Sequence, residues 1–207
     1  MSQVLFNNVL MNNNEKINEC IKNLLKLFNR RGYLDTNNED KIEKMVSDIK
    51  MNGKTNLTNG DIKISIYYKD NELKNISSGS EVDEFLSKNT DFIKFVLLKE
   101  FSKKVYKQVN EYKNSYIFNI YEMLEDIPSK NIIPEHQLLT DEDKEELKKV
   151  YDLTLIPKIY NTDMMSRYYG AKVGDVFRIK RLNLNSGIST YYRKVVHDSV
   201  ILFLTKS

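Results

Sequence analysis

The 207-residue chain is poor in the residues that build redox, metal and hydrolytic centres, with one cysteine, two histidines and no tryptophan. A single cysteine can form neither an internal disulfide nor a cysteine-based metal site. His136 and His197 lie in separate segments, which disfavours a histidine metal centre or a serine–histidine relay. No glycine-rich phosphate loop occurs. We therefore expect a protein of a reducing compartment that uses no cofactor, metal or small-molecule substrate.

Long apolar runs are also missing. No run approaches the roughly 18–20 apolar residues that cross a bilayer, so we expect no membrane association. The chain does have an apolar share of 41% and a charged share of 29%, which favours a folded core over disorder. Its length suits one large or two small domains, and we expect two.

Positive charge gathers near the C-terminus. The net charge of the chain is only +3, too small to indicate a free-standing nucleic-acid binder. Residues 163–196, however, contain seven basic and two acidic residues. This segment therefore either meets an acidic partner or a phosphate backbone, or is a solvated surface.

Residues 1–130 alternate between helical and strand-like periodicity. Apolar residues recur with helical spacing over 15–30, which places Cys20 on a buried stripe as a core thiol. Residues 62–68 alternate apolar and polar side chains, as in a strand with one buried face. The expected elements are helices at 15–30, 39–50, 81–87 and around 101–112, and strands at 62–68, 92–98 and 116–121. Helices interleaved with strands predict an α/β domain.

Residues 131–207 have a different pattern. Thr140 can cap a helix that carries Leu147, Val150 and Tyr151 inward. Thr162 or Asp163 can cap a short helix that ends at Gly170. Strands at 176–181 and 190–196, joined by a turn at 185–187, predict a β-hairpin. The sequence therefore predicts a small α+β domain at the C-terminus.

A series of C-terminal motifs carries a family resemblance. They are Pro134-Glu135-His136, the acidic-capped helix after Thr140, Ile156-Pro157-Lys158-Ile159, Asp163 to Gly170 with Arg167-Tyr168-Tyr169, the basic strand from Gly174 to Arg181, and Gly187 to Tyr192-Arg193. In this order and spacing the segment resembles the assembly domain of the fifth common subunit of eukaryotic nuclear RNA polymerases, a domain that occurs alone as a small polymerase subunit in archaea. Met164 stands where the family has proline, and residues 197–207 extend past the usual end as a further strand or a partner contact.

The resemblance implies a non-catalytic subunit of a DNA-directed RNA polymerase, whose assembly domain docks on the largest subunit and touches other subunits. The residues implied for that contact are Pro134, His136, Arg167, Tyr168, Gly170, Arg178, Arg181 and Arg193. For His136 itself, we favour a packed or hydrogen-bonded structural role over acid–base work. The divergence of residues 1–130 from the family, together with a composition that suggests an AT-rich genome, favours a large DNA virus as the source. A viral source implies the host cytoplasm and the virion, whereas a cellular source implies the nucleus.

The resemblance is weaker over residues 1–130, where Arg31-Gly32-Tyr33 is similar to a motif of the eukaryotic jaw domain. It implies a nuclease-like α/β fold without catalytic residues that projects toward downstream duplex DNA. The DNA-facing loop would correspond to Ser102, Lys103 and Lys104.

Two alternatives remain open from the sequence. Asp48 with Asp61-Ile62-Lys63 loosely matches the carboxylates and lysine of a metal-dependent nuclease. A stand-alone nucleic-acid-binding factor could instead use the basic hairpin, with Phe177, Tyr191 and Tyr192 as a stacking platform. Asp-x-Lys occurs often by chance in a chain of this charge, and tyrosines on a small sheet are more often core, so neither alternative is preferred.

Overall fold

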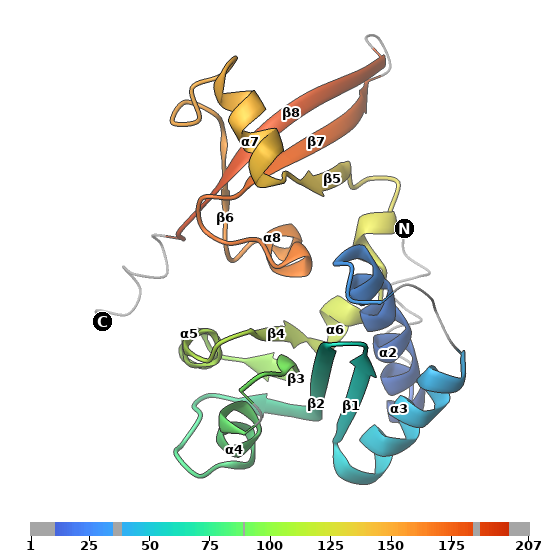
Figure 1. The fold of residues 1–207 in the computed structure, drawn as a ribbon. Helices are drawn as coiled ribbons and strands as arrows, with labels where there is room; N and C mark the ends of the chain where they lie inside the picture. The colour runs from blue at the N-terminus through green and yellow to red at the C-terminus, as the bar shows by residue number, and fades with distance from the viewer. Residues whose placement is uncertain (1–10, 35–38, 89, 184–186, 199–207) are drawn as a thin grey trace. The chain divides into compact units, whose positions relative to one another are not determined.

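The chain consists of two compact units, Met1–Asp126 and Ile127–Ser207 (Figure 1). The computed structural model describes residues 11–34, 39–88, 90–183 and 187–198. The division between the units falls close to the boundary at 130/131 that the sequence suggests.

The first unit is a mixed sheet with helices on both faces. Its elements are α2 (Asn13–Arg30), α3 (Glu39–Asn52), β1 (Lys54–Asn59), β2 (Ile62–Leu73), α4 (Glu81–Ser87), β3 (Ile93–Phe101), α5 (Lys103–Glu111), β4 (Ser115–Asn119) and α6 (Ile120–Met123). The strand order is β1-β2-β3-β4. β1 and β2 form an antiparallel hairpin, whereas β2, β3 and β4 run parallel to one another because α4 and α5 connect them.

Local sequence explains how α2 begins and ends. The Asn12 side chain accepts a hydrogen bond from the Glu15 amide, and the Glu15 carboxylate accepts one from the Asn12 amide, which is a capping box. Gly32 then adopts a left-handed φ of +70° just beyond the helix. Cys20 is fully buried on the inner stripe, where burial raises the pKa of its thiol to about 12, so the expected core thiol is confirmed.

The burial of β2 differs from the expectation of one buried face. Five consecutive residues, Ile64 to Tyr68, are buried. Tyr68 lies on the α2 side, where its hydroxyl is 3.3 Å from the Asn13 Oδ1, whereas Tyr67 packs with Phe85 of α4 on the opposite side. The prediction was wrong because β2 is an interior strand of a sheet covered on both faces.

Two element boundaries also differ from the sequence prediction. Phe101 ends β3, so α5 begins at Lys103 after its cap residue Ser102. Ile120 and Tyr121 belong to α6, because the Asn119 side chain caps that short helix and stops β4. In both places a side-chain cap, rather than the apolar pattern, sets the boundary between strand and helix.

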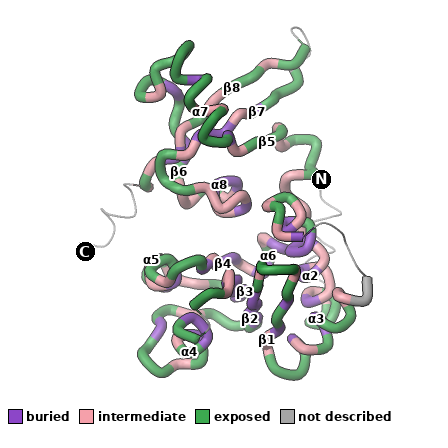
Figure 2. Tube along the Cα trace, viewed as in Figure 1, coloured by how far each residue is buried: buried purple, intermediate pink, exposed green. Residues whose placement is uncertain are grey.

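The second unit is built on another four-stranded sheet, of order β5-β7-β8-β6. Its elements are a 3₁₀ turn at Ile127–Ser129, β5 (Glu135–Leu138), α7 (Asp141–Lys148), β6 (Lys158–Tyr160), α8 (Met164–Tyr169), β7 (Val176–Asn183) and β8 (Gly187–Val196). β7 and β8 pair antiparallel from Val176↔Lys194 to Asn183↔Gly187, which confirms the expected hairpin. The short edge strands β5 and β6 were not predicted. Burial is densest at the base of the hairpin and decreases along it (Figure 2).

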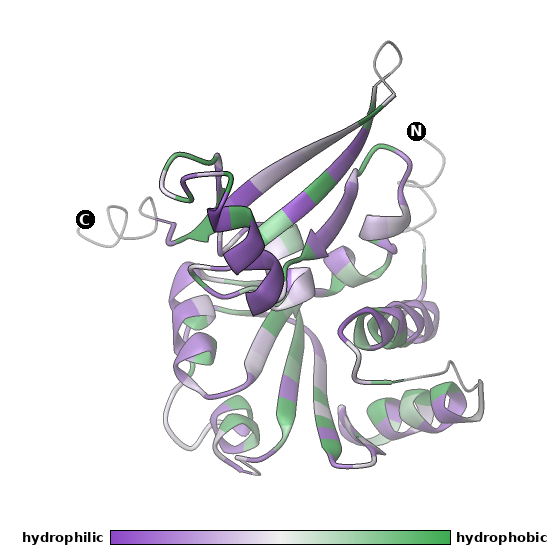
Figure 3. Ribbon diagram, turned by 45° about the horizontal axis from the view of Figure 1, so that its top comes forward, coloured by the Kyte–Doolittle hydropathy of each residue, from purple (hydrophilic) through white to green (hydrophobic). Residues whose placement is uncertain are grey.

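α7 is hydrophilic along almost its whole length, as its colour in Figure 3 shows. Thr140 caps it as expected, accepting a hydrogen bond from the Asp143 amide, and Leu147 is buried. Val150 and Tyr151 were expected to face inward, but they are 75% and 50% exposed. The helix ends at Lys148, so the helical spacing that would turn these two side chains inward does not reach them.

Candidate functional site

The turn around α8 is shaped by a cap at each end. Asp163 accepts a hydrogen bond from the Met165 amide, which identifies it as the cap; the Thr162 hydroxyl donates instead to Asp198. Gly170 closes the helix at a left-handed φ of +66°, a conformation that glycine adopts without steric cost. Met164 in place of proline therefore still permits the helix.

The side chains of this turn differ in exposure. The Arg167 Nε donates to the Thr162 carbonyl at 3.1 Å, which holds the guanidinium over the turn. Tyr168 is buried, with its ring edge-on to Tyr169 at a centroid distance of 5.5 Å. Tyr168 therefore contributes packing, while Arg167 is partly exposed.

His136 is held on β5 by a local hydrogen bond. Its Nδ1 lies 2.7 Å from the Pro134 carbonyl, which only accepts, so the proton belongs on Nδ1. The ring meets Phe177 edge-on at 5.8 Å. Burial lowers the pKa of His136, although the Pro134 carbonyl and Asp163 oppose this effect. These contacts agree with the structural role expected for His136.

The basic residues of the hairpin divide between its two faces. Cross-strand partners share a face of the sheet, and successive residues along one strand point to opposite faces. Arg181 and Arg193 therefore lie on the face of Phe177 and Ile179, together with the half-exposed Tyr191. We call Arg181, Tyr191 and Arg193 the arginine face. Both arginines are exposed, and neither has an ion-pair or hydrogen-bond partner within the part of the chain that the structure describes.

Arg178 lies on the opposite face of the hairpin. Its guanidinium is 3.7 Å from the Asp143 carboxylate and 3.4 Å from the Gln137 Oε1. Lys180, on the same face, pairs with Glu135 of β5 at 3.2 Å. The structure thus places Arg181 and Arg193 on one face, roughly 13 Å apart along the hairpin with Tyr191 between them, and Arg178 on the other face. Arg178 is occupied by contacts within its own unit.

The first turn of α5 carries the two lysines expected to face DNA. Ser102 caps the helix, and its hydroxyl also donates to the Lys74 carbonyl at 2.7 Å. Lys103 and Lys104 are exposed, and no acidic residue stands in this turn. Because a helix N-terminus already carries a partial positive charge, two lysines there build a local positive field with no counter-charge in the same turn.

The residues of the nuclease alternative do not converge. Asp48 accepts a hydrogen bond from Thr55 near the start of β1, and Lys63 pairs with Asp91 at 3.1 Å. Asp61 follows the far end of β1, roughly 13 Å or more from Thr55 at the usual rise per strand residue. Across residues 11–34, 39–88, 90–183 and 187–198, no group of three or more His, Cys, Asp and Glu residues could hold a metal ion.

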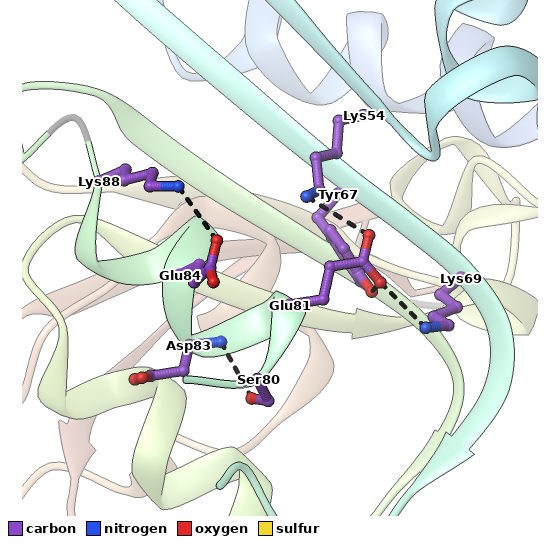
Figure 4. A network of polar contacts seen from close by, with 8 residues as sticks. All are labelled: Lys54, Tyr67, Lys69, Ser80, Glu81, Asp83, Glu84 and Lys88. Atoms are coloured by element: carbon purple, nitrogen blue, oxygen red, sulfur yellow. Dashed lines mark hydrogen bonds and ion pairs between the residues drawn. The ribbon is translucent and has the colours of Figure 1, made fainter. Parts of the chain in front are cut away.

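A polar network beside α4 escaped the sequence analysis. Glu81 accepts hydrogen bonds from Tyr67 and Lys69 and forms an ion pair with Lys54 at 3.3 Å (Figure 4). Next to it, Lys94 is 2% exposed, and burial lowers the pKa of its ammonium. In the sequence, the sign that could have indicated this polar region was Lys94, a single lysine inside the apolar run 92–98.

The family match and the individual relatives of this chain all point to the same family. Residues 125–195 match the family described as RNA polymerase Rpb5, C-terminal domain. DNA-directed RNA polymerase subunit 5 of Acanthamoeba polyphaga mimivirus is 26% identical over 199 residues, covering 91% of this chain and 96% of that protein. The archaeal subunit Rpo5 of Thermococcus onnurineus is 41% identical over 75 residues, covering 35% of this chain and 92% of that protein.

A second archaeal relative agrees with the first. Rpo5 of Methanocaldococcus jannaschii is 37% identical over 67 residues, covering 31% of this chain and 86% of that protein. No helix in the described residues is long and apolar enough to cross a membrane. The C-terminal match and the near-complete coverage of the archaeal subunits establish that the chain belongs to the Rpb5 family, subunit 5 of DNA-directed RNA polymerases.

Proposed function

We propose that this chain is a non-catalytic subunit of a multisubunit RNA polymerase, in which the second unit is the assembly domain and the first is a jaw domain. One observation carries the proposal: the Rpb5 match at 125–195 coincides with a self-contained unit, 127–207. About a third of this chain covers 92% of an archaeal Rpo5. The role common to both proteins therefore belongs to the second unit.

The assembly domain docks on the largest polymerase subunit through the arginine face and the α8 turn. Arg181 and Arg193, which have no ion-pair partner among the described residues, lie on either side of the exposed ring of Tyr191. Arginine and tyrosine are enriched where protein interfaces concentrate their binding energy. Pro134 and Gly170 contribute by holding His136 and the α8 turn in place, whereas Arg178 supports the fold through Asp143.

The jaw domain, a nuclease-like fold without nuclease activity, holds downstream duplex DNA through phosphates. Lys103 and Lys104 are exposed at a helix N-terminus, an arrangement that attracts phosphate. A polymerase must move over every sequence, so contacts to the backbone suit this role better than contacts to bases.

The match to a mimivirus subunit across 91% of the chain supports a polymerase of a large DNA virus. Such an enzyme would act in the host cytoplasm and be carried in the virion. The partners would then be the large and small subunits of that viral polymerase and the DNA that enters it.

Isolation of native complexes tests the proposal. The tagged full-length chain should co-purify stoichiometrically with the two largest polymerase subunits, identified by mass spectrometry, whereas a chain lacking residues 134–207 should not. The purified chain should also leave DNA uncut in Mg²⁺ or Mn²⁺. Normal incorporation of the truncated chain would refute the assembly role, and strong salt-dependent DNA binding without co-purification would favour the stand-alone factor.

A further inference from the structure

Four polar residues at paired positions on neighbouring strands form a row across the sheet of the first unit. Asn56 of β1 pairs with Ser65 of β2, Ser65 with Lys94 of β3, and Lys94 with Ser115 of β4. Ser65, Lys94 and Ser115 are all buried, in positions where apolar residues would otherwise fill the sheet. Since a buried ammonium is costly unless it is compensated, the lysine in this row requires an explanation.

Lys94 is only partly compensated within the fold. Its Nζ donates to the carbonyl of Leu86, in the last turn of α4, which has no basic residue of its own. That contact complements the helix dipole. It nevertheless uses one of three ammonium donors and provides no full negative charge. The Asp91 carboxylate also attracts the ammonium electrostatically, but it is already paired with Lys63 at 3.1 Å. Fixed hydrogen-bonding capacity and positive charge therefore remain.

A cavity of about 160 Å³ lies at this point, lined by Lys54, Asn56, Ser65, Glu84, Lys88 and Lys94 among others. Three of these side chains are cationic and one is anionic. The Ser65 hydroxyl donates to the Asn56 Oδ1 at 2.7 Å. This bond leaves the Asn56 amide NH₂ as a donor with no acceptor among the residues that the structure describes.

The two lysines at the rim can turn toward a ligand at little cost. Lys88 pairs with Glu84 at 3.0 Å and Lys54 with Glu81 at 3.3 Å (Figure 4). Glu81, Glu84 and Lys88 are exposed and Lys54 is partly exposed, and pairs of this kind contribute little to stability. Lys54 would also give up its position over the Tyr67 ring, whose centroid lies 5.6 Å from its Nζ. If Lys54 moves away, Glu81 keeps its hydrogen bonds to Lys69 and Tyr67.

We propose that this cavity binds a phosphate group, with Lys94 as its fixed cation, Asn56 as a neutral donor, and Lys54 and Lys88 as mobile cations at the rim. A tetrahedral oxyanion accepts hydrogen bonds on every side, and such bonds are strongest when the donor is charged. The site lies near the start of β3, while Lys103 and Lys104 follow the end of that strand, roughly 25–30 Å away at the rise of a strand. It is therefore separate from the DNA contact proposed above.

The test measures inorganic phosphate binding to the full-length chain by calorimetry and by thermal unfolding, with chloride at equal ionic strength as the reference. Phosphate should bind the native chain and raise its unfolding midpoint. Lys94→Met should weaken phosphate binding by about tenfold or more, the scale of one charge-assisted hydrogen bond. Lys99→Met, an exposed lysine on the same strand, is the matched control and should behave as the native chain does.

A second variant distinguishes a loss of phosphate binding from a folding defect caused by Lys94→Met. Lys54→Gln/Lys88→Gln retains the Lys94 contact with Leu86 and should still lose phosphate affinity by at least about threefold. A short DNA duplex added at low salt distinguishes the source of the phosphate: displacement of bound phosphate by the duplex identifies a backbone phosphate, and its failure to displace identifies a free phosphate. Equal responses of native and variant chains, or no response beyond that to chloride, would overturn the proposal.

Discussion

At the scale of single residues, His136 makes the second unit sensitive to pH. Burial lowers the pKa of the folded imidazole, whereas the unfolded chain keeps an ordinary value of about 6.5. The unfolded state therefore binds more protons between the two pKa values. The stabilising contribution is complete above pH of about 6.5 and is lost as the pH falls toward the folded pKa.

We therefore expect the free energy of unfolding to decrease from pH 7.5 to pH 5, and His136→Gln to remove part of that decrease. Denaturant titrations of the full-length chain at a series of pH values provide the measurement. His197→Gln, at an exposed position just after β8, is the matched control for the substitution itself. An identical pH dependence in His136→Gln and the native chain would contradict this account.

At the scale of elements, the β7–β8 hairpin permits a comparison of its two faces. Lys180 and Arg181 are neighbours whose side chains lie on opposite faces, and so are Arg193 and Lys194. Arg181→Ala/Arg193→Ala removes two positive charges from the arginine face, and Lys180→Ala/Lys194→Ala removes two from the other. The hairpin backbone and the total charge lost are the same in both variants.

We expect Arg181→Ala/Arg193→Ala to weaken binding to the largest subunit by about tenfold or more, the usual effect of removing central interface arginines. Lys180→Ala/Lys194→Ala should change it by less than about threefold, because the contact of Lys180 with Glu135 is exposed. Competition between tagged variants and the native chain during polymerase assembly measures both. Equal losses would mean that net charge, and not one face, drives docking.

At the scale of the whole molecule, we expect the two units to have separable tasks. Lys103→Glu/Lys104→Glu in the first unit should leave incorporation into polymerase intact. It should weaken retention of downstream duplex to a similar extent on all templates, with a salt slope shallower by about 1–2. Salt titration of assembled polymerase on two unrelated templates is the measurement. Unchanged retention and slope would remove both lysines from the DNA contact, and template-dependent loss would indicate base readout.

Local signals were sufficient for the elements whose ends are chemically marked. Asp163 and Gly170 mark the two ends of α8, and Thr140 marks the start of α7. The spacing of apolar residues was enough to locate α2. The same reasoning failed for Val150 and Tyr151, because the end of α7 carries no comparable marker in the sequence. The edge strands β5 and β6 were missed because three or four residues are too few to establish a period.

The sequence alone determined the family, the order of the main helices and strands, and the basic character of the hairpin, because these depend on residue type and spacing along the chain. Which charged side chains share a face depends on the pairing of the strands in space. Strand register places Arg178 near Asp143 and puts Arg181 and Arg193 on the opposite face, on either side of Tyr191. It also aligns Asn56, Ser65 and Lys94, although they come from three separate strands. This is because the register between paired strands sets which face a side chain lies on and which residues of the neighbouring strand lie opposite it. No local sequence pattern encodes the register between strands that are distant in the chain.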